Sequence, residues 1–211
     1  MAYTLNDYHY DATTKVPHSY AVYGDRLTAS LPQPVNGLRL LDLGCGRGFW
    51  SEHFSRSGAN VIGVDASSGG IERARASYPS LDFRQLAITE DLLDVLRETP
   101  FDAVVSIEVV EHVYDPRGFA RACFNALRPG GTLVITTPYH GYFKNLAISL
   151  IDGWDKHFTA LWDGGHVKFW SRDTLTRLLK EIGFVDIRFQ YCGRVPLLWM
   201  GMIAVATKPR E

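Results

Sequence analysis

The chain has 211 residues, 46% of them hydrophobic and 21% charged, and its formal net charge at pH 7 is −1. This length suits one globular domain with a sizeable core, so we expect a single domain over residues 1–211. A balanced charge provides no field that attracts nucleic acid, and we expect no nucleic-acid partner.

Strands and helices alternate along most of the chain. A proline-containing stretch, residues 31–37, follows an N-terminal arm (residues 1–34) that we expect to form a helical cap. Apolar runs predict strands over 38–43, 61–64, 83–88, 101–107 and 132–137. Helical periodicity follows Gly48 and recurs over 71–77, 91–97 and 117–127, where a left-handed glycine within 129–131 is expected to end the helix.

The last part of the chain breaks this alternation. A helix is predicted over 175–182, and the strands predicted over 185–191 and 202–207 are joined by too few residues for a helical crossover, so they pair antiparallel. We therefore predict an α/β fold with a doubly wound, mostly parallel seven-stranded sheet and an antiparallel last strand. Residues 138–170, rich in His, Trp and Tyr, predict a helical, aromatic lid over a flat or apolar small-molecule substrate.

Two further features bear on the location of the protein. The N-terminal segment has neither a basic start nor an apolar run, so no secretory signal is expected. The longest apolar stretch, residues 195–206, is shorter than the roughly 20 residues that span a bilayer. We expect a cytoplasmic protein without a transmembrane segment.

A glycine-rich turn follows the first strand. The sequence Asp42-Leu-Gly44-Cys45-Gly46-Arg-Gly48 leads into a helix at the carboxyl end of the sheet, where open α/β sheets bind their ligands. The second strand ends in Asp65, 19 residues beyond Gly46, where a carboxylate can accept both hydroxyls of a ribose. A ligand-free turn and a strand-end cap are the alternatives to a cofactor site.

The spacing of this turn distinguishes two kinds of cofactor. The pattern is G-x-G-x-G, whereas dinucleotide-binding turns have G-x-G-x-x-G. Asp42 suits the ammonium group of S-adenosylmethionine and would repel a pyrophosphate, which favours bare N–H groups. Asp42 could instead accept from the N–H groups of the turn itself. The sequence therefore favours S-adenosylmethionine over a nicotinamide dinucleotide.

These motifs resemble those of the class I S-adenosylmethionine-dependent methyltransferases. The resemblance continues through Phe101-Asp102 and through residues 127–133, and covers residues 38–137. It implies a Rossmann-like fold and methyl transfer. It also implies a set of cofactor-binding residues: Asp42, Gly44, Cys45, Gly46, Asp65, Ala66, Ala87, Ile88, Ile107 and Glu108.

Candidate catalytic residues follow the fourth strand. If residues 107–115 are helical, Glu108, Glu111 and His112 share one face. His112, oriented by Glu111, could remove the proton of an acceptor hydroxyl. The same three side chains could hold a divalent cation that acidifies a catechol-like acceptor, or the Glu-His pair could only orient its loop.

The remaining candidate site residues are a second histidine and aromatic residues of the N-terminal arm. His166, beside a glycine and close to Lys168, is an alternative base, or else a loop histidine that bonds the backbone. The arm carries aromatic and histidine side chains that we expect to cover the cofactor or simply to pack on the sheet: Tyr8, Tyr10, His18, Tyr20 and Tyr23.

Within the class, the chain resembles the ubiquinone-biosynthesis O-methyltransferases. The similar segments are 108–112, Thr137-Pro138, an Asn-Leu pair at 145–146, and 165–169. The resemblance implies O-methylation of an aromatic or prenylated hydroxyl compound in a biosynthetic pathway, a weak membrane contact through 146–154, and a metal site at the Glu/Glu/His set. An N- or C-methyltransferase, a non-catalytic cofactor-binding module and a nicotinamide oxidoreductase remain alternatives. The oligomeric state leaves no recognisable pattern.

Overall fold

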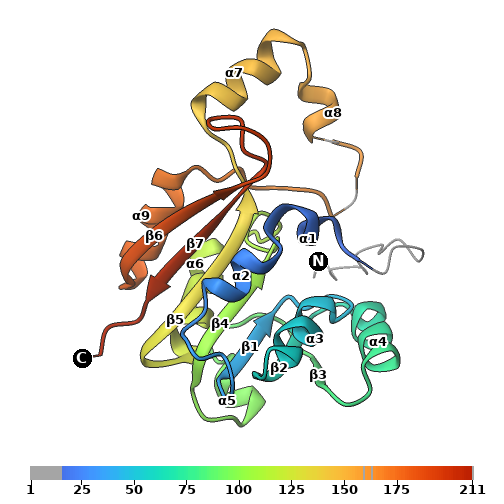
Figure 1. Ribbon diagram of the computed structural model, residues 1–211, viewed down its shortest axis with the longest axis vertical. Coiled ribbons are helices and arrows are strands. Elements are labelled where there is room, and N and C mark those ends of the chain that lie inside the picture. The colour runs from blue at the N-terminus through green and yellow to red at the C-terminus, as the bar shows by residue number, and fades with distance from the viewer. Residues whose placement is uncertain (1–15, 159, 163, 211) are drawn as a thin grey trace, which may run out of the picture.

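A seven-stranded sheet forms the centre of the computed structural model, which describes residues 16–158, 160–162 and 164–210 (Figure 1). The strand order is β3-β2-β1-β4-β5-β7-β6, and β7 runs antiparallel to both of its neighbours while the remaining pairs are parallel. The predicted sheet and its antiparallel last strand are therefore confirmed. The strands are Arg39–Leu43 (β1), Asn60–Asp65 (β2), Asp82–Gln85 (β3), Phe101–Ile107 (β4), Leu127–Pro138 (β5), Val185–Cys192 (β6) and Gly201–Thr207 (β7).

Helices cover both faces of this sheet. Because side chains alternate along a strand, Leu41 of β1 packs with the helices of one face, whereas Leu40 packs with the helices of the other. The first face carries α5, α6 and α9, and the second carries α1, α2 and α3. The helices are His18–Tyr23 (α1), Asp25–Ala29 (α2), Phe49–Arg56 (α3), Ser68–Ser77 (α4), Leu92–Leu96 (α5), Pro116–Ala126 (α6), Tyr142–Leu150 (α7), Trp154–Phe158 (α8) and Arg172–Ile182 (α9).

Two local predictions were wrong. Helix α6 ends at Ala126, and its C-cap, Leu127, is already extended because β5 begins there. Gly130 is left-handed at φ 75°, but it lies inside β5 and does not end the helix. Residues 108–115 form a series of turns rather than a helix, since Glu108 has a φ of 55°, outside the right-handed helical region.

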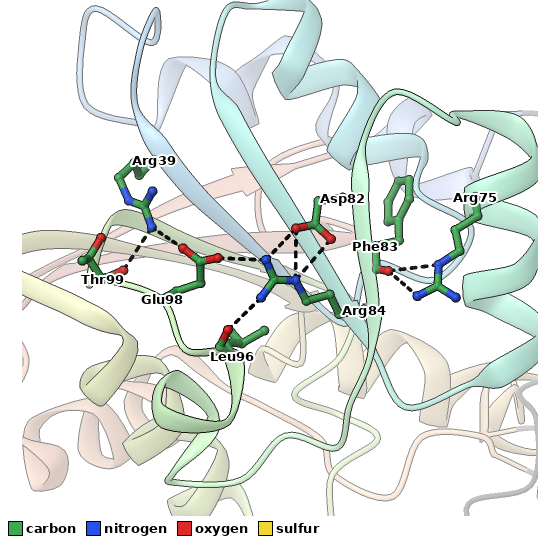
Figure 2. A network of polar contacts seen from close by, with 8 residues as sticks. All are labelled: Arg39, Arg75, Asp82, Phe83, Arg84, Leu96, Glu98 and Thr99. Carbon is green, nitrogen blue, oxygen red and sulfur yellow. Dashed lines mark hydrogen bonds and ion pairs between the residues drawn. The ribbon is translucent and has the colours of Figure 1, made fainter.

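The amino ends of the strands are joined by a network of ion pairs (Figure 2). Glu98, between α5 and β4, accepts from Arg39 of β1 at 2.9 Å and from Arg84 of β3 at 2.8 Å. Arg84 also donates to Asp82 at 2.6 Å and to the carbonyl of Leu96 at 2.8 Å. These contacts connect β1, β3 and the α5–β4 loop at the edge of the sheet opposite the glycine turn.

The segment that follows β5 rises above the carboxyl edge of the sheet as α7 and α8 (Figure 1). Its return, residues 164–170, lies against the loop after β4, because the N–H groups of Val167 and Lys168 both donate to the carbonyl of Glu111 at 2.9 Å. The indole of Trp170 also donates to the carbonyl of Val110 at 3.1 Å. Lid residues and β4-loop residues are thereby held at one cavity.

Candidate active site

The glycine turn after β1 is tied to the neighbouring strand β2. The N–H groups of Gly44 and Cys45 donate to the carbonyl of Val64 at 2.7 and 3.0 Å. Gly44, Gly46 and Gly48 have φ values of 82°, 52° and 79°, which L residues with a side chain rarely adopt. The turn thus needs glycine for its backbone conformation, and it leaves its backbone facing a large cavity at the carboxyl edge of the sheet.

Asp65 ends β2 beside this turn. Its Oδ2 accepts from the N–H of Gly46 and its Oδ1 from the N–H of Ser67, both at 2.8 Å. Burial raises the pKa of Asp65, and the two backbone N–H groups oppose that shift. The carboxylate lines the cavity in a fixed orientation. Because each carboxylate oxygen keeps a free lone pair, the two oxygens can accept hydrogen bonds from the two hydroxyls of a ribose.

The other predicted cofactor residues divide into two groups. Most of them line the same cavity as Asp65, from the glycine turn past the end of β3 to the end of β4: Gly44, Cys45, Gly46, Ala66, Ala87, Ile88, Ile107 and Glu108. Their arrangement along adjacent strands matches an elongated nucleoside ligand. Asp42 is absent from this lining.

Asp42 lies beneath the turn. Its side chain is 1% exposed and accepts from the hydroxyl of Ser51, in α3, at 2.5 Å. Burial raises the pKa of Asp42 to about 7, and the Ser51 hydrogen bond opposes the rise. In this position the carboxylate anchors α3 to the end of β1. The hydroxyl of Ser51 bonds only Oδ2, and Asp42 is not among the residues that line the cavity, so its contact with an ammonium group stays a prediction.

Glu108, at the end of β4, is held by the N-terminal arm. The hydroxyl of Tyr23, in α1, donates to its Oε1 at 2.5 Å, and the hydroxyl of Thr136 donates to the same atom at 3.2 Å. Burial raises the pKa of Glu108, and both hydroxyls oppose that shift. Helix α1 therefore reaches the end of β4, and its residues His18, Ser19, Val22 and Tyr23 help to line the cavity. Tyr8 and Tyr10 lie outside the described residues.

A carboxylate and two imidazoles meet beside Glu108. One ligand atom each from Glu111, His112 and His166 lie within 4.8 Å of one another, and the two rings have centroids 4.9 Å apart. The Nδ1 of His112 lies 2.8 Å from the carbonyl of Gly164. Because a carbonyl only accepts, Nδ1 carries the hydrogen and Nε2 carries the lone pair. Burial lowers the pKa of both histidines, that of His166 to about 4.

The Glu111 carboxylate lacks compensation within the described part of the chain. It is 1% exposed, and neither of its oxygens has a hydrogen-bond partner there. Burial raises its pKa well above the ordinary value and the nearby Glu108 adds to the rise, while its own backbone N–H and the nearby Thr137 hydroxyl oppose it. Buried orphaned oxygens of this kind fit a cation or a proton donor. The cluster contains His166 in the place expected for Glu108, whose oxygen is already engaged by Tyr23 and Thr136.

Two cations of the cavity were missed in the sequence. Lys144 comes from α7 and Arg194 from the loop between β6 and β7, and both line the cavity. Neither residue belongs to a motif, and their juxtaposition arises only when the lid and this loop meet over the sheet. No pattern in the sequence could have paired them.

Fold and site together define a class: a Rossmann-like cofactor-binding protein whose glycine turn and strand-end carboxylate line a large cavity at the carboxyl edge of the sheet. Residues 15–188 match the family described as "Methyltransferase domain". The chain belongs to this family and is an S-adenosylmethionine-dependent methyltransferase.

The chain is also similar to individual proteins of known name or structure. The chain is 38% identical to a ubiquinone biosynthesis O-methyltransferase of Dinoroseobacter shibae over 173 residues, which are 79% of this chain and 67% of that relative. A methyltransferase structure from Mesorhizobium loti has a TM-score of 0.66 and 24% identity, covering 88% of this chain and 97% of its own. The cyclase SpnF has a TM-score of 0.67 and 18% identity, covering 89% of this chain and 80% of its own. The fold alone thus does not define the reaction.

The helices of the described residues are all too short or too polar to cross a membrane. A cytoplasmic location stays a prediction.

Proposed function

We propose that this chain transfers a methyl group to the hydroxyl oxygen of a small aromatic or prenylated compound. The observation that carries the proposal is the cluster of Glu111, His112 and His166, whose two imidazoles line the cavity that also contains Asp65 and the glycine turn. A hydroxyl group that receives a methyl group must lose its proton, and an imidazole of this cluster would take that proton. The name of the relative from Dinoroseobacter shibae, an O-methyltransferase of ubiquinone biosynthesis, supports the same reaction and a biosynthetic role.

The chemistry divides between cofactor and protein. When bound, S-adenosylmethionine supplies an electrophilic methyl carbon, which bonds to the acceptor oxygen as the carbon–sulfur bond breaks and its electron pair stays on sulfur. The protein must hold the acceptor in line and remove its proton. Asp65 orients the ribose, and α1 closes over the end of β4 through the Tyr23–Glu108 hydrogen bond.

The lone pair on Nε2 of His112 is the proposed destination of the hydroxyl proton. Its tautomer is set by the carbonyl of Gly164, so the nitrogen that faces away from that carbonyl is the basic one. His166, with its ring 4.9 Å away, is the second candidate base. The buried carboxylate of Glu111 would stabilise an imidazolium beside it.

The same cluster fits a divalent cation. Glu111, His112 and His166 offer one oxygen and two nitrogens, a mixed set that transition metals accept, and the orphaned Glu111 oxygens would gain ligand bonds. A cation at this position would lower the pKa of an acceptor hydroxyl. In the set that the sequence suggested, Glu108, Glu111 and His112, Glu108 could contribute Oε2, because Tyr23 and Thr136 both bond its Oε1.

The lid suits an apolar acceptor. His140, Phe158 and Phe169 make edge-to-face contacts on the inner side of the lid, with ring centroids 4.4 to 5.0 Å apart. At the end of α7, Leu150 and Ile151 are 78% and 77% exposed, and Ile151 also lines the cavity. We propose that these exposed apolar side chains make the weak membrane contact expected for residues 146–154, which would give a prenylated acceptor access to the cavity.

An acceptor screen tests the reaction. Purified protein is incubated with S-adenosylmethionine and matched aromatic acceptors carrying a hydroxyl, an amine or only carbon positions, with and without EDTA and added Mg²⁺ or Zn²⁺. We expect S-adenosylhomocysteine and a methyl ether from the hydroxyl acceptor alone. His112→Gln should lower kcat about 10²- to 10⁴-fold with cofactor binding retained. The control is His53→Gln, on α3 outside the cavity. Methylation only at nitrogen or carbon would contradict the proposal.

A further inference from the structure

Helix α7 of the lid has an inverted pattern. Its one buried residue is Lys144, which is 5% exposed, whereas Tyr142, Phe143 and Leu150 on the same helix are 75%, 54% and 78% exposed. A surface helix normally buries apolar side chains and exposes charged ones. Burial of an ammonium group costs free energy unless other groups compensate it, so this lysine needs a reason to point inward.

The protein compensates this ammonium group only in part. Lys144 Nζ donates to the carbonyl of Tyr139 at 2.6 Å, which uses one of its three hydrogens. Within residues 16–158, 160–162 and 164–210, no carboxylate lies at ion-pair distance from Lys144 or Arg194. The nearby acid, Glu108, already accepts from Tyr23 and Thr136.

A second cation faces the same part of the cavity. Arg194 lies on the loop between β6 and β7, beside Met200, which also lines the cavity. The pKa of Lys144 is lowered to about 8, chiefly by burial and then by Arg194, while Glu108 opposes the shift. The two cations also lower the pKa of His157, after burial. Two cations therefore face one acid, Glu108, in this part of the cavity, with Lys144 buried and Arg194 exposed.

The position of these cations separates them from the expected cofactor. The glycine turn follows β1 and Asp65 ends β2, whereas Lys144 is anchored to Tyr139, next to the end of β5, and Arg194 lies beyond β6. Neighbouring strands are about 4.8 Å apart, so β5 lies about 10 Å from β1, with β4 between them. The methyl-accepting end of the cavity, with Glu111, His112 and His166, is closer to these cations than the ribose end is.

We propose that Lys144 and Arg194 form an anion subsite for the acceptor, so that the preferred acceptor is a hydroxyl compound carrying a carboxylate. Lys and Arg both form charge-assisted hydrogen bonds to carboxylates, and two hydrogens of Lys144 remain for this purpose. A singly charged group suits the subsite because Glu108 faces the same region and would oppose a phosphate dianion. The inference rests on the proposed function for the identity of the acceptor, and not for the binding of the anion.

The test compares two probes of equal shape. Binding of 3,4-dihydroxybenzoate and of 3,4-dihydroxybenzamide to the protein saturated with S-adenosylhomocysteine is measured by calorimetry, and methylation of each is measured with S-adenosylmethionine. The variants are Lys144→Met, Lys144→Arg and Arg194→Met. Matched controls are Lys180→Met and Arg177→Met, which change exposed residues of α9 outside the cavity.

We expect the wild type to bind the acid about 10- to 100-fold more tightly than the amide, as one charge-assisted hydrogen bond provides. Lys144→Met and Arg194→Met should lose this preference, Lys144→Arg should keep most of it, and the controls should keep it fully. If the acid binds selectively but no acceptor hydroxyl is methylated, the anion subsite stands and the proposed function fails.

Three results would overturn the subsite. Equal binding of acid and amide to the wild type shows that no charge is recognised. Weaker binding of S-adenosylhomocysteine itself to Lys144→Met, with the acid preference intact, assigns the lysine to the carboxylate of the cofactor. A uniform loss of kcat for both probes in Lys144→Met, again with the preference intact, makes the lysine a base.

Discussion

The two edges of the sheet treat their charges differently. At the amino edge, Glu98 accepts from Arg39 and Arg84, and Asp82 completes a network in which every acid faces an arginine (Figure 2). At the carboxyl edge, Glu111 has no hydrogen-bond partner in the described part of the chain. The side chains of the first edge are partly exposed and paired with opposite charges, although the buried Nε of Arg39 has no partner there, whereas the Glu111 carboxylate is buried with no ion-pair partner in the described part of the chain.

This difference shows where charged groups lower the free energy of unfolding. Exposed ion pairs stabilise a protein by about 1 kcal/mol or less, so the amino edge costs little and contributes little. Buried acids with raised pKa values, such as Asp42 and Glu111, are destabilising when ionised, and such groups gather at functional sites. The comparison therefore points to the carboxyl edge as the site of chemistry, independently of any motif.

The largest expected effect is at Asp42. Its pKa is about 7 in the folded protein and 3.8 ordinarily, so the folded state holds this proton more tightly between those values. The free energy of unfolding should therefore fall as pH rises from 4 to 7, and ionised Asp42 costs up to about 4 kcal/mol above that range. Asp42→Asn removes the charge and keeps an oxygen for Ser51.

Urea unfolding of the cofactor-free protein at pH 5 and pH 8 measures this effect. Relative to the wild type, Asp42→Asn should be markedly more stable at pH 8 than at pH 5. The same difference at both pH values would show that the Asp42 carboxylate is not desolvated as the structure indicates.

The next effect concerns the arm. Tyr23→Phe removes the hydroxyl that donates to Glu108 and leaves a buried carboxylate with one fewer donor, so the free energy of unfolding should fall by about 1.5 to 3 kcal/mol. Tyr20→Phe, in the same helix, is the matched control, because the Tyr20 hydroxyl has no hydrogen-bond partner among the described residues. Thermal unfolding compares them, and equal losses would contradict the role given to Tyr23.

The smallest effect is at the amino edge. Glu98→Gln removes the acid that joins Arg39 and Arg84, and should cost about 1 kcal/mol because the network is partly exposed. The arginines hold the pKa of Glu98 below its usual range, so its contribution is complete at both pH 5 and pH 8. The loss should be equal at these pH values and shrink in 1 M salt. If the loss in the free energy of unfolding grew with salt, it would contradict the weak, screened ion pairs that we assign to the amino edge.

Much of the fold could be predicted because its signals are local. Runs of β-branched residues separated by helical periodicity gave the sheet, and the short connection before Met202 gave the antiparallel strand. The end of α6 was mispredicted because Leu127 pairs with Phe101 in the sheet, a contact between distant residues that overrides the glycine signal at Gly130.

The site could be predicted only where one motif supplies it. The glycine turn and Asp65 are separated by one helix and one strand, so their spacing indicates their proximity. The pairing of His112 with His166 and of Lys144 with Arg194 depends on the lid and loop folding back over the sheet. The burial of Asp42 beneath the turn could not be predicted, because sequence does not show on which side of the turn its carboxylate lies.

Calorimetric titration with S-adenosylmethionine, S-adenosylhomocysteine and NADH tests the central claim most directly. Both adenosyl compounds should bind and NADH should not. Asp65→Ala, which loses a carboxylate able to accept two ribose hydrogen bonds, should bind them at least about 100-fold more weakly. Asp82→Ala, on the neighbouring strand at the amino edge, should bind them like the wild type. Binding of NADH alone, of no nucleoside at all, or equal binding by Asp65→Ala would contradict the account.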